Sequence, residues 1–252
     1  MTHRPSNSPS LAWFTVAFVS ILFLGTSAVG QEYKSLFNGK DLSGWEGSSK
    51  LWKVEDGQIV GTTIGNPLEA NTFLIAEDVN VSDFHLKLKL RMTGESNSGI
   101  MYRAQTLEGG PFRLKGPQMD IHPKHEYQGM YYSEQTGRGI VAQRGQKVLI
   151  PADLNAKGKT TPQVRGDLGK DPAFDLSEWI TYEIIATGRR SVHKMNGVVT
   201  VDVVDRDTST ILNGMIGLQL HRGPDMTIFV KDVELRQKLN AKDAKALIEK
   251  KK

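Results

Sequence analysis

Three short stretches of the sequence place hydrogen-bonding and titratable side chains at every second position. Residues 99–103, 118–122 and 216–221 each alternate between apolar side chains and small or polar ones. Because successive side chains of a β-strand point to opposite faces, the apolar members are expected to face a core. The outward set is then Gly99, Met101, Arg103, Gln118, Asp120, His122, Gly217, Gln219 and His221.

These residue types could act together on a sugar. The carboxylate of Asp120, or the imidazole of His122, could remove a proton, and His221 could donate one. Arg103 could stabilise a developing negative charge. If the three strands are neighbours, Gln118 and Gln219 would bind sugar hydroxyls on the same polar sheet face.

Plainer interpretations stay open for the same residues. On strands that are not neighbours, the outward positions would be ordinary exposed sites. Asp120 would then be a strand carboxylate paired with an arginine, Arg103 a structural ion-pair partner and His221 a surface histidine.

The stretch from residue 107 to residue 175 differs from the strand-like remainder. It is rich in glycine, proline and charged residues, and only short segments resemble strands. Long loops in a compact domain are usually functional or disordered, so we expect this stretch to elaborate a site. Within it, Glu134 and Arg138 could close over a substrate, and Tyr132 could stack on a sugar.

The composition excludes several kinds of chemistry. Without cysteine there can be no thiolate nucleophile, disulfide or Cys-ligated zinc. His122 and His125 are three residues apart, but Pro123 argues against a helix that would aim both at a zinc ion. No metal-binding loop, phosphate-binding glycine loop or serine nucleophile elbow is recognisable. Calcium or another divalent cation held by Asp, Glu and His side chains stays open.

Strand patterns dominate residues 31–238. Residues 84–91 alternate without interruption, with leucines and Phe84 facing a core and His85, Lys87, Lys89 and Arg91 facing water. Residues 192–204 predict a hairpin around Asn196-Gly197, a type I′ turn pair. Strands are also expected at residues 179–186 and 227–235. Many antiparallel strands with tight turns predict a sandwich or jelly roll.

The two ends of the chain differ from this domain. Residues 1–30 have the polar, apolar and small-residue order of a secretory signal, with cleavage expected before Gln31. The apolar run is short for a membrane span, and no cysteine follows it for a lipid anchor. Residues 239–252 form a basic tail that could be helical. The net charge of +4 is small and gives no basic surface for nucleic acid.

Several segments in order resemble the 3-keto-disaccharide hydrolase family. The opening Leu-Phe-Asn-Gly-Lys-Asp-Leu-Ser-Gly-Trp at residues 36–45 carries the resemblance most clearly. Pro117 stands where an aromatic residue is more usual, and Ile180 stands where asparagine is. The other matching segments are residues 52–57, 83–86, 97–103, 116–121, 179–184, 196–197 and 216–221.

The resemblance implies a concanavalin A-like jelly-roll β-sandwich of two antiparallel sheets, with long loops around a concave face. It also implies cleavage of glycosides already oxidised to a ketone at sugar carbon 3. Such a ketone acidifies the hydrogen on carbon 2, so a base can start an elimination that water later completes. The enzyme would then need no spaced carboxylate pair, and a cation could hold the enolate.

Two other functions compete with this interpretation. A non-catalytic carbohydrate-binding module would need hydrogen bonds and a stacking aromatic, such as Tyr102, Tyr127, Tyr131 or Tyr132, but no titrating pair. An adhesive cell-surface domain would use the basic tail on anionic surfaces. The sequence favours an exported enzyme, periplasmic or secreted, that acts on an oligosaccharide or glycoside, without a membrane span after signal cleavage.

Overall fold

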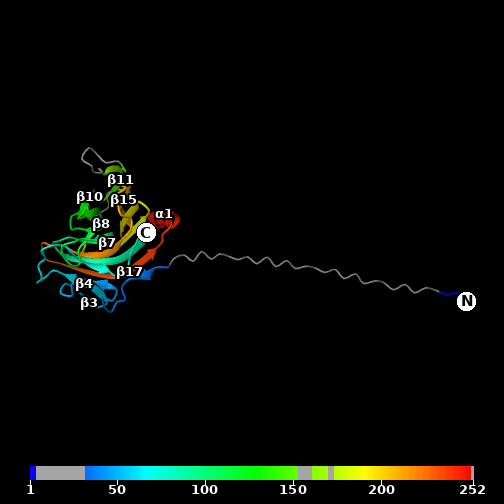
Figure 1. The fold of residues 1–252 in the computed structure, drawn as a ribbon, viewed down its shortest axis with the longest axis horizontal. Helices are drawn as coiled ribbons and strands as arrows, with labels where there is room; N and C mark the ends of the chain where they lie inside the picture. The colour runs from blue at the N-terminus through cyan, green and yellow to red at the C-terminus, as the bar shows by residue number, and fades with distance from the viewer. Residues whose placement is uncertain (4–31, 153–160, 170–172, 251–252) are drawn as a thin grey trace. The chain divides into compact units, whose positions relative to one another are not determined.

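The computed structural model describes residues 1–3, 32–152, 161–169 and 173–250. The chain divides into two units, Met1–Gly30 and Gln31–Lys252, and Figure 1 shows the strands and the helix of the second unit. The predicted signal segment and its cleavage position lie outside the described residues, apart from residues 1–3. Among the helices that the structure describes, none is long and apolar enough to cross a membrane.

The first layer of the second unit is a ten-stranded sheet. All its neighbouring strands are antiparallel except β11 and β15, which run parallel. Its order is β12 (Gln163–Asp167), β11 (Gln146–Ile150), β15 (Val198–Asp205), β14 (Arg190–Met195), β13 (Ile180–Thr187), β6 (Phe84–Gly94), β17 (Met226–Gln237), β4 (Gln58–Thr62) and β3 (Trp52–Glu55), with β1 (Lys34–Ser35) beside β17.

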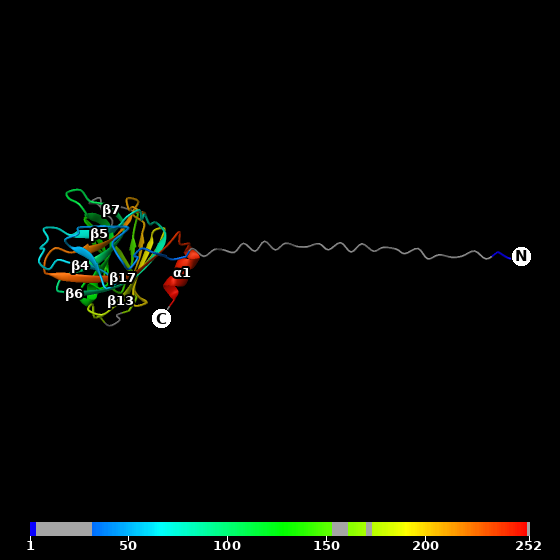
Figure 2. The same ribbon diagram turned by 90° about the horizontal axis from the view of Figure 1, so that it is seen from below.

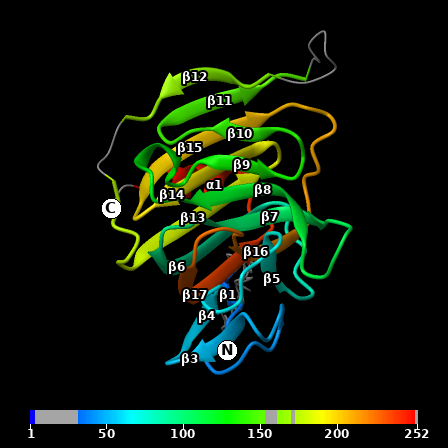
Figure 3. The ribbon, with the colours of Figure 1, turned by 90° about the vertical axis from the view of Figure 1, so that its left-hand side faces the viewer.

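The second layer is a seven-stranded antiparallel sheet, which overlaps the first in the view of Figure 3. Its order is β10 (Gly139–Ala142), β9 (Tyr131–Glu134), β8 (Leu114–Ile121), β7 (Ser98–Thr106), β16 (Met215–Leu220), β5 (Thr72–Ala76) and β2 (Trp45–Glu46). Strands β7, β8 and β16 carry the three stretches with alternating polar residues, and they are neighbours, so the shared-face arrangement is the one that forms.

Alternating apolar side chains from the two sheets form the main core. From β6, Phe84, Leu86, Leu88 and Leu90 are buried against residues of the seven-stranded sheet that include Met119. This confirms the predicted inward face of residues 84–91. The outward face differs at one position, because His85 is only 2% exposed.

The cover over His85 comes from a segment far away in sequence. Tyr33 places its hydroxyl 2.6 Å from His85 Nδ1, and Glu183 places Oε2 3.0 Å from Nε2. The expectation that His85 faces water is therefore wrong. Alternation sorts residues by sheet face, but it does not reveal what packs over the face.

The predicted hairpin is confirmed between β14 and β15. Asn196 and Gly197 both have positive φ angles, of 47° and 81°, as a type I′ turn requires. At the C-terminus, helix α1 (Ala241–Glu249) begins at Asn240, whose side chain accepts a hydrogen bond from the Asp243 amide.

Helix α1 packs on the outer side of the ten-stranded sheet, and Figure 2 shows it outside the sandwich. Ala244 and Leu247 of the helix pack in one hydrophobic cluster with Ile185 and Val192 of the sheet. Lys194 Nζ donates to the carbonyls of Leu247 and Lys250, at 2.8 and 3.1 Å. The basic segment is therefore partly a packed element.

Candidate functional site

A hollow of about 460 Å³ opens on the outer face of the seven-stranded sheet. It lies on the side of the sheet away from the main core. Its lining combines carboxylates, amides, imidazoles and aromatic rings: Asn71, Asn97, Gln118, Asp120, His122, Tyr127, Met130, Tyr132, Glu134, Gln135, Ile140, His221 and Arg222.

The floor of this hollow is a row across three strands. Asp120 of β8 lies opposite Gly99 of β7, and the β7–β16 pairing continues the row toward Gln219. Gly99 leaves the space that the row needs, because a Cβ there would come within 2.2 Å of Gln118 Cδ. The Gln118 side chain therefore lies over the Gly99 backbone.

Asp120 sits at the bottom of the hollow. Its side chain is 1% exposed, and Oδ1 accepts hydrogen bonds from Gln118 Nε2 at 3.0 Å and Asn97 Nδ2 at 3.5 Å. Burial raises the pKa of Asp120 to about 7, even though both amide hydrogen bonds act in the opposite direction. A carboxyl with this pKa can both take and release a proton near neutral pH.

The two glutamines beside Asp120 carry unused hydrogen-bonding capacity. Gln118 is 1% exposed and Gln219 is fully buried. Gln118 Oε1 and both side-chain amide atoms of Gln219 lack a partner among the described residues. An unsatisfied buried polar group costs about 1–3 kcal/mol, so three such atoms beside a hollow indicate that water or a ligand completes them.

The rim of the hollow is held together by side-chain amides. Glu134 Oε1 accepts from Asn71 Nδ2 at 3.1 Å and from Gln135 Nε2 at 3.4 Å. Asn71 Oδ1 accepts from the Arg222 backbone amide at 3.0 Å. Asn71 thus ties the β9 end to the segment after β16 and fixes Glu134 at the rim.

Two histidines line the same hollow. His221 Nδ1 lies 2.5 Å from the Arg222 carbonyl oxygen. Since a carbonyl only accepts, Nδ1 carries the hydrogen and Nε2 is left for proton exchange. His122 packs edge-on against Tyr127, with ring centroids 5.0 Å apart. Burial and the nearby charge of Lys124 lower the pKa of His122, which favours a neutral imidazole.

Arg103 does not join this group. Met101 lies opposite Gln118, yet Gln105 lies opposite Lys115, so β7 contains one extra residue relative to β8. Arg103 sits in this bulge with a φ of 48°. A bulge inverts the alternation of the residues that follow it, so the prediction that Arg103 shares the outer face with Met101 is wrong.

The bulge turns Arg103 toward the other sheet. Its Nε and Nη2 donate to the Ser82 carbonyl at 2.9 and 2.6 Å, and Nη2 lies 3.6 Å from Asp83 Oδ1. Arg103 lines a separate hollow of about 240 Å³, together with Tyr131 and Arg138.

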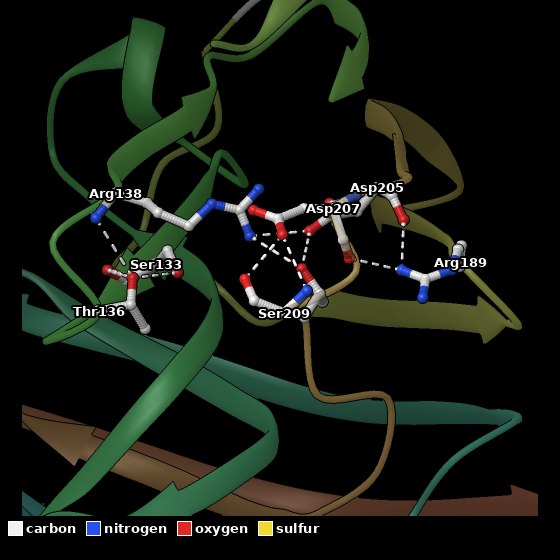
Figure 4. Close-up of polar contacts among 8 residues, drawn as sticks. Ser133, Thr136, Arg138, Arg189, Asp205, Asp207 and Ser209 are labelled. Atoms are coloured by element: carbon white, nitrogen blue, oxygen red, sulfur yellow. Dashed lines mark hydrogen bonds and ion pairs between the residues drawn. The ribbon is translucent and has the colours of Figure 1, made fainter. Parts of the chain in front are cut away.

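Arg138 does not line the Asp120 hollow, and Figure 4 shows its side chain extending toward the segment of Asp205, Asp207 and Ser209. Its Nη1 donates to Asp205 Oδ2 at 2.8 Å and to Thr210 Oγ1 at 3.3 Å. Arg189 Nη1 donates to the Asp205 and Asp207 carbonyls. Arg138 therefore joins the β9–β10 turn to the segment after β15, and the expectation that it closes over a substrate at Asp120 does not fit this direction.

The remaining sequence-based candidates lie together. Those lining the hollow are Asp120, His122, His221, Glu134, Gln118 and Tyr132. Gln219 is buried on the same sheet face beside them. Sequence reasoning missed Asn71, Asn97 and Arg222; Asn97 begins a segment that alternates into β7, whereas nothing local marks Asn71 or Arg222.

The divalent cation that the sequence leaves open has no evident ligand set in the described part of the chain. No group of three or more His, Asp or Glu side chains there is close enough to hold a metal ion. His122 and His125 do not share a helix face, since residues His125–Tyr127 form a single 3₁₀ turn.

The sequence matches a known family over most of its length. The family, described as the 3-keto-alpha-glucoside-1,2-lyase-like domain, matches residues 32–236. No curated protein sequence matches the chain.

Solved structures confirm the predicted jelly-roll fold. A Parabacteroides distasonis protein provisionally classed as a glycosyl hydrolase is 21% identical, with a TM-score of 0.54 and coverage of 83% of this chain and 95% of that one. The carbohydrate-binding module CBM66 from Bacillus subtilis is 15% identical, with a TM-score of 0.52 and coverage of 77% and 96%.

Proposed function

The chain belongs to the 3-keto-alpha-glucoside-1,2-lyase-like family, and from that premise we propose that it cleaves glycosides whose carbon 3 is already a ketone. The observation that carries the proposal is Asp120: a buried carboxyl with a pKa of about 7, at the bottom of a hollow beside amide atoms that have no partner in the described part of the chain. Perturbed pKa values of this kind are typical of functional sites.

Asp120 acts as the base in the proposed reaction. It removes the hydrogen from carbon 2, and the electron pair of that bond moves toward the carbon 3 oxygen as an enolate. The pair then returns to form the C1–C2 double bond as the bond from carbon 1 to the leaving oxygen breaks. Water later adds its hydroxyl to carbon 1 and a hydrogen to carbon 2, and carries the reaction to hydrolysis.

The groups beside Asp120 supply the remaining steps. Gln219 Nε2, a buried donor without a partner among the described residues, stabilises the enolate oxygen, in the role first expected for Arg103. Gln118 Oε1 accepts from a sugar hydroxyl. His221 gives the leaving oxygen its proton, with Glu134 as the alternative acid at the rim. Such donors act strongly where water is excluded.

A carbohydrate-binding module of the same fold is the second candidate. Its support is the fold likeness to CBM66, which is named as a carbohydrate-binding module, and the aromatic rings of Tyr127 and Tyr132 in the hollow. A binding module transfers no proton, so it would not need a carboxyl with the raised pKa of Asp120. We therefore place this candidate second.

Two further parts of the proposal concern location and cofactor. The segment 1–30 directs export to the periplasm or the medium. The described residues form no set of three ligands for a divalent cation; if one such as calcium were bound in the hollow, it would supply charge stabilisation to the enolate.

The test compares a 3-keto-glucoside bearing a chromogenic leaving group with the unoxidised glucoside. Residues 31–252 of the wild type and of Asp120→Asn are assayed with and without a chelator. We expect release from the keto substrate alone and its loss in the variant. A loss of wild-type activity with chelator, restored by calcium, supports the cation.

Two results would contradict the proposal. Equal release from both glucosides would remove the role of the ketone. No release from either, together with saturable sugar binding, would favour the binding module.

A further inference from the structure

A second hollow of about 220 Å³ adjoins the Asp120 hollow. Both are lined by Asn71, Glu134, Gln135 and Arg222, so they are two compartments of one groove on the same sheet face. Glu134 lies between them, where a bond joining two parts of a bound glycoside would lie.

The second compartment is built on an apolar floor. Phe73 and Leu114 line it and are almost fully buried in a small cluster on the outer sheet face. The loop over this cluster is fixed by backbone hydrogen bonds: the Phe73 amide donates to the Phe112 carbonyl and the Leu107 amide to the Arg113 carbonyl, both at 2.9 Å. The compartment is therefore a preformed part of the fold.

The second compartment adds Arg113 to the Arg222 that it shares with the Asp120 hollow, and it lacks the carboxyl of Asp120. Arg113 and Arg222 both line it, and within the described residues neither forms an ion pair with a carboxylate. Arg113 Nη1 donates to the Gly109 carbonyl at 3.2 Å, its one hydrogen bond to another described residue. The one carboxylate present, Glu134, is already held by Asn71 and Gln135.

We propose that this compartment binds the leaving group of the substrate and selects one that carries a carboxylate. A compartment lined by two arginines and an apolar floor matches a carboxylate on an apolar body, because arginine binds carboxylates through parallel hydrogen bonds. The inference rests on the proposed function for its orientation: the 3-keto sugar lies over Asp120, and the leaving group passes Glu134 toward Arg113 and Arg222.

The test uses two 3-keto-glucosides that differ in one group. One has 5-hydroxy-2-nitrobenzoate as its leaving group, and the other has the corresponding neutral carboxamide. We expect the wild type to prefer the carboxylate by about tenfold or more in kcat/KM. In Arg113→Gln/Arg222→Gln the ratio falls to about one, because kcat/KM for the carboxylate falls about tenfold further than kcat/KM for the carboxamide.

The control variant is Lys53→Gln, which removes an exposed positive charge from β3 in the other sheet. It should keep the wild-type ratio, and melting curves check that all variants fold. A wild-type ratio near one, or a ratio that survives the double substitution, would overturn the inference.

A binding measurement separates this inference from the proposed function. The free 5-hydroxy-2-nitrobenzoate and its carboxamide are titrated into the wild type and the double variant. If neither glucoside is cleaved, the proposed function fails, and tighter binding of the acid that the double variant loses still supports an acid-binding compartment. Equal binding of acid and amide overturns it.

Discussion

Two polar clusters lie on opposite sides of the seven-stranded sheet, and they differ in how their hydrogen bonds are used. In the cluster of Figure 4, the Arg138 Nη1, Asp205 and Thr210 groups bond to one another at distances of 2.8 to 3.3 Å, and one buried atom, Arg138 Nη2, has no described partner. In the groove, Asp120 has two amide donors, but Gln118 and Gln219 keep three buried amide atoms without a described partner.

The difference separates a structural role from a binding role. Paired charges and hydroxyls hold the β9–β10 turn to the segment after β15, so that cluster stabilises the fold. Unpaired buried amides lower stability, so their presence in the groove indicates that water or a ligand forms hydrogen bonds with them. Substitutions in the groove should therefore affect activity, and substitutions in the Arg138 cluster should affect stability.

The largest effect is expected for Asp120→Asn. General acid–base groups contribute about 10²–10⁴-fold, so activity on a 3-keto-glucoside should fall by that factor. The midpoint of thermal unfolding should not fall, because asparagine removes a costly buried carboxyl. Asp205→Asn is the matched control: it should lower the unfolding midpoint and leave kcat nearly unchanged. A lower unfolding midpoint for Asp120→Asn together with a lower kcat for Asp205→Asn would contradict the roles assigned to the two clusters.

Next in size is Gln219→Met, which replaces the unpaired amide with an apolar chain of similar length. We expect kcat/KM to fall roughly 10²-fold, as when one oxyanion donor is removed. The free energy of unfolding should rise by about 1 kcal/mol, because two unsatisfied atoms disappear. Chemical denaturation and steady-state kinetics measure both, and a large loss of stability would contradict the assignment.

A smaller effect is expected for Arg138→Met on the opposite side of the sheet. This leaves Asp205 buried without its arginine, although Thr210 still donates to it. Since Arg138 is partly exposed to solvent, the cost should be roughly 1–3 kcal/mol, below that of a fully buried pair. Urea unfolding measures it. A kcat change above about threefold would show that the two clusters are coupled.

The pH dependence of activity should be the mildest test. With its pKa near 7, Asp120 is protonated at pH 6, so kcat/KM should be about tenfold below its plateau and rise through pH 7. Asp120→Asn should lose this rising limb. A wild-type profile that is flat between pH 5 and 8 would exclude Asp120 as the base.

The free energy of unfolding should also depend on the Asp120 carboxyl. Its contribution to stability should fall as the pH rises, whereas activity should rise. The folded protein holds the Asp120 proton more tightly than the unfolded chain, whose pKa is near 3.8. The contribution to stability is therefore full below about pH 4 and is lost as the pH rises to about 7. The wild type minus Asp120→Asn difference in unfolding free energy should shrink or become negative over this range.

Much of the site could be predicted from residue order because strand alternation is a local property. It placed Gln118, Asp120 and Gln219 on one face, and the fold made their strands neighbours. The alternation rule fails where a strand contains one extra residue, because the side chains after it then point to the other face. The bulge at Arg103 reverses the side-chain direction within β7, and no local feature of the sequence announces its positive φ angle.

Contacts between distant segments could not be predicted from local sequence patterns either. Arg138 donates a hydrogen bond to Asp205, and Asn71 donates one to Glu134; each pair is separated by more than sixty residues in sequence. Such pairs depend on how two loops end beside one another. For the same reason Tyr33 over His85 could not be foreseen.

The central claim is that the reaction begins by removal of the hydrogen on carbon 2, and the most direct measurement is a kinetic isotope effect at that position. A chromogenic 3-keto-glucoside is prepared with hydrogen or deuterium on carbon 2, and release is followed in the wild type at pH 8. We predict that the deuterated substrate reacts several-fold more slowly. Equal rates, together with release from the unoxidised glucoside, would contradict the account and indicate ordinary glycoside cleavage.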